Sequence, residues 1–139
     1  MIPGSKDGRA DSVMRDILGI RHFVRATGNS LCGLWEAFRN GCAFRQEMAF
    51  SLTQFAALCF IRESVWVKTG LVSLWVILLA LELVNSAVEA VVDLVSPEWN
   101  VLAKRAKDQC SAAVFLIVVL IASVWLIVGV RQFCRLAGD

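Results

Sequence analysis

Histidine, tyrosine and proline are scarce in this sequence, which has one histidine, no tyrosine and two prolines. With a single histidine, His22, no metal site that needs two histidines on one helix can form. Gly28 and Gly33 have the spacing of a phosphate-binding loop, but Leu34 and Trp35 stand where lysine and a hydroxyl residue should follow. The net charge is only +2, so the strongly basic face of a nucleic-acid-binding protein is also lacking, and we expect no nucleic-acid partner.

Cysteine pairs with metal-binding or redox spacing are also missing. The number of cysteines is odd and no two have CxxC spacing, so we expect buried, reduced thiols rather than disulfides or a zinc site. The N-terminus is polar and has no apolar segment typical of a signal peptide, so any membrane segment is predicted to be internal. Residues 1–10 are predicted to form a disordered tail. The five cysteines are Cys32, Cys42, Cys59, Cys110 and Cys134.

Apolar residues are abundant, at 58% of the chain, and they are clustered. Apolar residues at helical spacing, with arginines on the other side, predict an amphipathic helix that lies at a membrane surface. The Asn40-Gly41 pair predicts a break after it. Three later runs are long enough to cross about 30 Å of hydrocarbon as helices. We therefore expect an all-α membrane protein with one domain over 11–139, a surface helix over about 11–39 and spans over about 42–61, 70–92 and 112–130.

The connection between the second and third predicted spans contains Ser96, Pro97 and Glu98. These residues are typical of a helix start, with an N-cap serine, a proline at the first helical position and an acid in the first turn. Nine of the 14 basic residues precede the first span or lie between the second and third, and a tenth, Arg45, lies in the first turn of the first span. Because basic residues favour the cytoplasmic side, we expect the N-terminus and this connection in the cytoplasm.

Polar side chains form one stripe on the second predicted span. Glu82, Asn85, Glu89 and Asp93 are spaced three and four apart, which places them on one helix face. A charge at mid-membrane costs about 2.5–3.5 kcal/mol, so we interpret Glu82 and Glu89 as a functional site rather than an interhelix contact. They lie about 10 Å apart along the helix, so one could meet a metal-bound phosphate and the other a lipid hydroxyl.

A second polar face precedes the third predicted span. Its members are also spaced three and four apart, so they share one side of a helix. A lysine here is either a phosphate partner or an anchor at the cytoplasmic surface, and the pattern leaves both open. The face consists of Lys104, Lys107, Asp108 and Ser111.

At these residues the sequence resembles the bacterial integral-membrane diacylglycerol kinases, which are related to undecaprenol kinase. The resemblance extends from about Arg21 to Val130 and is most specific over Glu82–Asp93. The AFRQE stretch is more similar to the diacylglycerol branch than to the undecaprenol branch. The matching stretches are AFRQE at 43–47, ELVNSAVEAVVD at 82–93, SPE at 96–98, and AKD at 106–108 followed by SAA at 111–113.

The resemblance implies a fold, a reaction and a location. The fold is a homotrimer of three-span chains with active sites shared between neighbouring subunits. The reaction transfers the γ-phosphate of ATP, with Mg²⁺ as cofactor, to the primary hydroxyl of diacylglycerol and yields phosphatidic acid. The location is the bacterial inner membrane, where such a kinase recycles phospholipids.

The resemblance also implies roles for individual residues. Glu82 is the general base, and Glu89 is the metal ligand. The ATP-binding residues are Glu89, Glu98, Lys107, Asp108, His22 and Asn29. The lipid-binding residues are Arg45, Gln46, Glu47, Asn85 and Ser111.

One position departs from the family pattern. The family usually has a second metal-binding glutamate six residues before the last residue of AFRQE, and here that residue is Gly41. The departure leaves open a non-catalytic membrane subunit beside the diacylglycerol kinase. Undecaprenol kinase is the other alternative.

Overall fold

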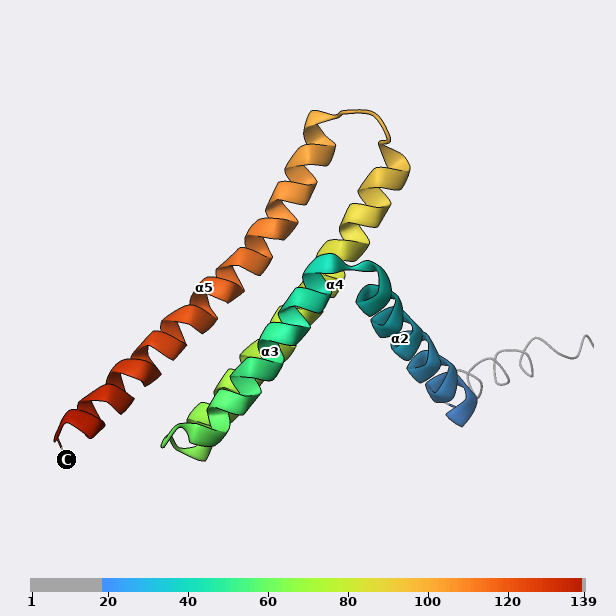
Figure 1. Cartoon of the computed structure of the whole chain (residues 1–139). Helices are drawn as coiled ribbons and strands as arrows, with labels where there is room; N and C mark the ends of the chain where they lie inside the picture. Colours follow the sequence, from blue (N-terminus) through green and yellow to red (C-terminus); the bar gives the residue numbers. More distant parts are fainter. Residues whose placement is uncertain (1–18, 139) are drawn as a thin grey trace, which may run out of the picture. The chain divides into compact units, whose positions relative to one another are not determined.

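The computed structural model describes residues 19–138, except the side chain of Ile20. This part of the chain contains α-helices and no strand, so the predicted all-α fold class is confirmed. The predicted tail over 1–10 and the predicted start of the surface helix lie outside the described residues. The helices are α2 (Ile20–Asn40), α3 (Cys42–Phe60), α4 (Val65–Val95) and α5 (Val101–Gly138) (Figure 1).

The chain divides into two compact units, residues 1–36 and residues 37–139. In the first unit, the described side chains from Arg21 to Glu36 on α2 are all exposed, including Phe23, Leu31 and Trp35. An exposed apolar stripe on a helix with basic residues is typical of a helix at a membrane surface. The prediction of one domain over 11–139 stays a prediction.

Gly41 separates α2 from α3, as the Asn40-Gly41 pair predicted. Its backbone N–H donates to the Ala37 carbonyl oxygen at 2.8 Å, and its extended conformation then starts α3. A Cβ atom added at Gly41 would lie 2.7 Å from the same oxygen. The close approach of the two backbone segments therefore requires glycine.

In the second unit, α4 packs against both α3 and α5 (Figure 1). The core between α4 and α5 contains Trp75, Leu78 and Ile121. On the α3 side, the ring of Phe50 lies 5.8 Å from that of Trp75, measured between centroids. The central position of α4 follows from its apolar residues at helical spacing, which bury one face against both neighbours.

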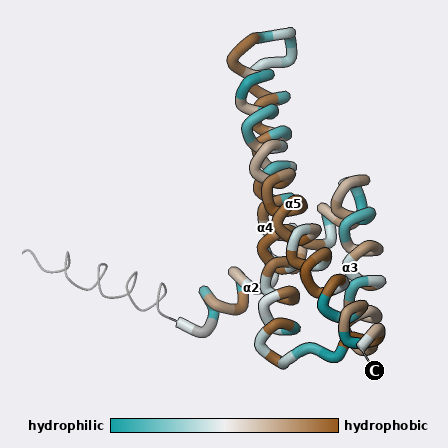
Figure 2. The backbone as a smooth tube through the Cα atoms, turned by 90° about the vertical axis from the view of Figure 1, so that its left-hand side faces the viewer, coloured by the Kyte–Doolittle hydropathy of each residue, from teal (hydrophilic) through white to brown (hydrophobic). Residues whose placement is uncertain are grey.

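Helices α4 and α5 are long and apolar enough to cross a membrane. With 31 and 38 residues they extend about 46 and 57 Å, more than the hydrocarbon thickness of about 30 Å. Hydrophobic residues are concentrated along the middle of both helices, and hydrophilic residues become more frequent toward their connecting loop (Figure 2). Helix α3 contains Arg45 and Glu47 and does not meet the same criterion. A third crossing by α3 stays a prediction.

The predicted helix start at Ser96 is wrong, because residues 96–100 form a loop and α5 begins at Val101. A residue before proline avoids the helical conformation, and Ser96 instead ends α4, with its N–H donating to the Val92 oxygen. The N-cap of α5 is Asn100. Its side-chain oxygen accepts from the N–H groups of Leu102 and Ala103 at 2.8 and 3.3 Å.

The cysteines are free, as predicted, but the expectation that they are buried is wrong. Cys110 is half-buried, and the other four are exposed. They lie on helix faces that the rest of their own unit leaves uncovered, and helical period alone does not reveal which apolar face is covered.

At the end of the second unit away from the α4–α5 loop, the α3–α4 connection binds the last turns of α5. The Arg135 guanidinium lies 3.2 Å from a Glu63 carboxylate oxygen and also donates to the Arg62 carbonyl oxygen. The Arg62 N–H donates to the Gln132 side chain at 3.4 Å. The Glu63 side chain is only 5% exposed. We call Arg62, Glu63, Gln132 and Arg135 the clasp.

Candidate functional site

The predicted polar stripe lies on the face of α4 that is buried in the second unit. Glu82 is 5% exposed and Asn85 is 9% exposed. Glu89 is half-buried, and Asp93 is exposed. Trp75 and Leu78 continue the same stripe toward the start of α4, and their packing holds the face inward. Burial of the stripe therefore decreases from Glu82 to Asp93.

Asn85 connects the buried part of the stripe to the half-buried part. Its Nδ2 atom donates to Oε1 of Glu89 at 3.2 Å. Its Oδ1 atom is buried and has no hydrogen-bond partner. Asn85 can therefore orient the Glu89 carboxylate and still accept a hydrogen bond from a ligand hydroxyl.

A third carboxylate joins Glu82 and Glu89 from another helix. The charge of Glu47, on α3, interacts with that of Glu82, which in turn interacts with that of Glu89. One oxygen of Glu47 is buried without a hydrogen-bond partner. None of the ion pairs within residues 19–138 includes these three acids. Like charges gathered without a cation are costly, which is typical of a functional site.

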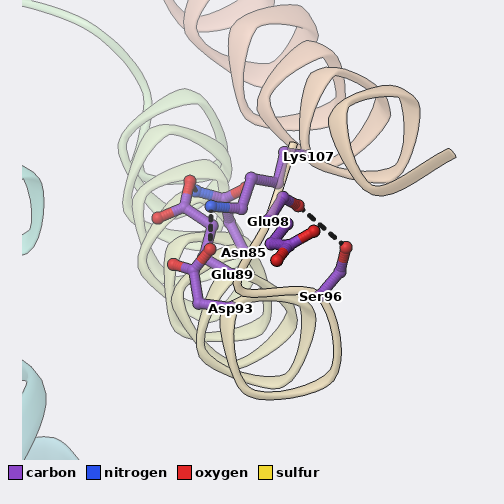
Figure 3. Close-up of polar contacts among 6 residues, drawn as sticks. All are labelled: Asn85, Glu89, Asp93, Ser96, Glu98 and Lys107. Carbon is purple, nitrogen blue, oxygen red and sulfur yellow. Dashed lines mark hydrogen bonds and ion pairs between the residues drawn. The ribbon is translucent and has the colours of Figure 1, made fainter. Parts of the chain in front are cut away.

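Near the loop between α4 and α5, Lys107 of α5 extends toward the face of α4 that carries Asn85, Glu89 and Asp93, as Figure 3 shows. The Lys107 ammonium lies 2.5 Å from a carboxylate oxygen of Asp93, one turn beyond Glu89. The Lys104 ammonium lies 2.5 Å from Asp108 on α5 itself. The predicted polar faces of α4 and α5 therefore meet at this end of the hairpin.

A hollow of about 440 Å³ lies beside these ion pairs. The loop contributes Glu98, which is exposed, and the Ser96 hydroxyl donates to the Glu98 backbone oxygen at 3.1 Å (Figure 3). Polar groups of both charges therefore line one open surface. The lining residues include Asp93, Ser96, Glu98, Lys104, Lys107 and Asp108.

A larger and mostly apolar cavity, of about 800 Å³, lies among α3, α4 and α5. Gln46 and Glu47 line it together with Phe50, Trp75 and Trp125. The indole N–H groups of both tryptophans are buried without hydrogen-bond partners. We call Glu47, Glu82 and Glu89 the acid row. Because Glu47 also interacts with Glu82, the cavity adjoins the acid row.

The remaining predicted residues lie apart from these contacts or in the first unit. Arg45 is exposed and donates to the Arg39 carbonyl oxygen at 2.8 Å. Ser111 is exposed on α5. His22 and Asn29 lie on α2 and are exposed. The assignment of these four residues to the lipid or to ATP stays a prediction.

Two residues without a role in the sequence-based assignment prove relevant. Asp93, which the sequence places on the polar stripe, binds Lys107, and Trp75 lines the large cavity. Trp75 also lies on the stripe of Glu82 at three- and four-residue steps, so following that face toward the start of the helix would have found it.

The carboxylates of the site can be compared with the ligands that Mg²⁺ needs. Within residues 19–138 no group of three His, Cys, Asp or Glu side chains could hold a metal ion. Glu89 does offer a half-buried carboxylate oriented by Asn85. Mg²⁺ in kinases is usually held by one or two carboxylates together with substrate phosphates. The site therefore fits a metal that arrives with a nucleotide, with Glu89 as its protein ligand.

Comparison with known proteins identifies the class. The family described as prokaryotic diacylglycerol kinase matches residues 28–129. A diacylglycerol kinase of Haemophilus influenzae is 39% identical over 107 residues, 77% of this chain and 91% of the relative. One of Escherichia coli K12 is 35% identical over 78% of this chain and 89% of the relative. One of Pseudomonas aeruginosa is 36% identical over 77% of this chain and 87% of the relative.

These matches cover most of the chain and most of each relative. The chain belongs to the prokaryotic diacylglycerol kinase family. The predictions of this family and of a kinase are therefore confirmed. Together with the two long apolar helices, membership also indicates a bacterial membrane protein.

Proposed function

We propose that this protein transfers the γ-phosphate of MgATP to the primary hydroxyl of diacylglycerol and so makes phosphatidic acid. The observation that carries the proposal is the stripe of acids on α4, with Glu82 as its most buried acid and with Asp93, one turn beyond Glu89, paired with Lys107 of α5. Acids buried in an apolar helix are costly and need a compensating role. The names of the relatives support diacylglycerol as the acceptor.

Glu82 acts on the lipid hydroxyl. Its carboxylate accepts the hydroxyl proton as the oxygen attacks the γ-phosphorus and the bond from that phosphorus to the β–γ bridging oxygen breaks to release ADP, which makes Glu82 the general base. Asn85 has a buried oxygen without a partner, and this oxygen orients the attacking hydroxyl. The exclusion of water from this face limits the transfer of phosphate to water.

The groups at the hairpin end hold the nucleotide. Lys107 contacts the phosphates as a point charge, and Asp108 and Glu98 bind the rest of the nucleotide along the loop. Glu89 is the metal ligand, and Asn85 keeps its carboxylate oriented. Glu89 would hold Mg²⁺, which when bound would supply charge neutralisation for the phosphates, and phosphoryl transfer depends mainly on such positioning and charge stabilisation.

The large cavity accommodates the lipid. Its walls are mostly apolar, with Gln46, Glu47 and Gln54 as the polar side chains of α3, so acyl chains fill it while the head group lies at the edge with Gln46 and Glu47. Glu47 borders both the cavity and the acid row, which brings the head-group hydroxyl to Glu82. Arg45 and Ser111 contact the lipid from outside the cavity.

Assembly and orientation form part of the same proposal. The protein is a homotrimer in the bacterial inner membrane, with active sites shared between subunits. α3, α4 and α5 each cross the membrane, and the N-terminus and the α4–α5 loop are cytoplasmic. His22 and Asn29 on α2 bind ATP. The distribution of basic residues and the family resemblance support this arrangement.

The test is transfer of labelled γ-phosphate from MgATP to diacylglycerol in mixed micelles, with undecaprenol in a parallel reaction. We expect label in phosphatidic acid. Label only in the undecaprenol reaction would keep the kinase and change its substrate. Absence of label in both, from assembled protein, would reject the proposal.

The second candidate is a non-catalytic membrane subunit. The observation that favours it is Gly41, since a carboxylate is usual there in the family and this glycine allows the close approach to Ala37. The same assay distinguishes the candidates. A subunit of this kind would leave both lipids unlabelled.

A further inference from the structure

The proposed function gives Asp93 no role, although Asp93 forms an ion pair with Lys107. The pair joins α5 to α4 across 14 residues of sequence, with the ammonium and the carboxylate oxygen 2.5 Å apart. Figure 3 shows the Lys107 side chain extended from α5 toward the face of α4 that carries Asn85, Glu89 and Asp93.

This pair contributes little to stability. The side chains of Lys107 and Asp93 are 35% and 66% exposed, and exposed ion pairs are weakened by water and salt. The buried residues Trp75, Leu78 and Ile121 already hold the two helices together. The main physical consequence of the pair is therefore restriction of a long, flexible lysine side chain.

Without Asp93, the position of the ammonium would change in a predictable direction. Glu89 lies one turn before Asp93 on the same face of α4. It is half-buried, has no cation partner among the described residues and would attract the released lysine. A lysine on Glu89 would occupy the carboxylate that the proposed function assigns to the metal.

We infer that Asp93 is a positioning residue that holds the Lys107 ammonium toward the nucleotide phosphates and away from Glu89. The inference rests on the proposed function for the roles of Lys107 and Glu89. Asp93 itself touches neither substrate nor metal. It acts through Lys107, and its removal should weaken nucleotide binding more than it slows transfer.

The first test is Asp93→Asn, which keeps the shape of the side chain and removes its charge. We expect the KM for MgATP to rise about fivefold and kcat to change less than about twofold. Asp93→Glu should restore most of the affinity because it restores the charge. Glu36→Gln is the charge-matched control, since it removes an exposed acid from α2 and should leave both constants unchanged. A loss confined to kcat, or no change, would overturn the inference.

The second test asks whether Asp93 acts through Lys107. In a Lys107→Gln background, Asp93→Asn should cause no further loss of nucleotide affinity, because no ammonium remains to be positioned. A purely structural role would instead give additive losses. Additive losses would overturn the inference, and complete non-additivity would support it.

Binding of Mg²⁺ with a non-hydrolysable ATP analogue, measured by equilibrium dialysis on the whole protein, separates this inference from the proposed reaction. If neither lipid is phosphorylated but Asp93→Asn still weakens binding and depends on Lys107, the reaction is wrong and the positioning role holds. If the lipid is phosphorylated and binding does not depend on Asp93, the reaction holds and the positioning role is wrong.

Discussion

The two ends of the second unit both pair an acid with a cation, but in different surroundings. At the hairpin end, a half-buried Lys107 and an exposed Asp93 form a pair beside an open polar hollow. In the clasp, Arg135 binds Glu63, whose side chain is buried, and it also donates to a backbone oxygen. Exposed pairs contribute about 0–1 kcal/mol, whereas a buried acid that loses its partner destabilises the fold by several times more. The hairpin end can therefore rearrange around a ligand, while the clasp is structural.

The largest expected effect separates activity from stability at the acid row. Glu82→Gln removes the proposed general base but keeps the size of the side chain and one acceptor oxygen. We expect transfer to fall by about 10²- to 10⁴-fold. Thermal unfolding and oligomer size, measured by gel filtration, should not change. Retained transfer would show that Glu82 is not the base.

At the clasp we expect a loss of stability without a loss of transfer. Arg135→Ala leaves the buried Glu63 without its cation, and we expect a loss of about 1–3 kcal/mol in unfolding free energy, since Arg135 is itself half exposed. Transfer by the folded protein should persist. Arg131→Ala, which removes an exposed cation one turn earlier, is the control and should change stability little. Equal effects of the two substitutions would contradict a structural role for the clasp.

A smaller effect, on the KM for the lipid, is expected in the large cavity between the two ends. Ala122 lines it, so Ala122→Leu should occupy space assigned to acyl chains and raise the KM for dioleoylglycerol about fivefold. The KM for MgATP should not change. Ala113→Leu makes the same change on an exposed part of α5 away from the cavity. An unchanged lipid KM in Ala122→Leu would place the lipid elsewhere.

The smallest effect concerns the missing family carboxylate. Gly41→Glu adds a possible ligand but also a Cβ atom against the Ala37 oxygen, so we expect about 1 kcal/mol of destabilisation. Gly41→Ala should show the same steric loss. If the carboxylate reaches the metal, only Gly41→Glu should lower the Mg²⁺ concentration for half-maximal rate, by about twofold. Equal magnesium curves would show that position 41 does not contribute a ligand.

Local patterns predicted the helices because helix formation depends on residues a few positions apart. The break at Gly41 and the acid stripe on α4 both follow from such spacing. The predicted helix start at Ser96 is wrong because Ser96 and Pro97 fit a helix start as well as a helix stop. The competing cap at Asn100, with two backbone N–H groups on its side chain, decides between them.

From the sequence alone we could predict an all-helical membrane protein with acids on one face of its second span, and its family resemblance predicted a kinase. Composition and helical period suffice for the helices and the acid face, since both are read along one segment at a time. Only the tertiary structure decided that Glu47 of α3 adjoins Glu82 and that Lys107 of α5 binds Asp93. Those contacts depend on the rotation and depth at which helices pack, which are set by the summed contacts of many side chains and not by spacing within one helix.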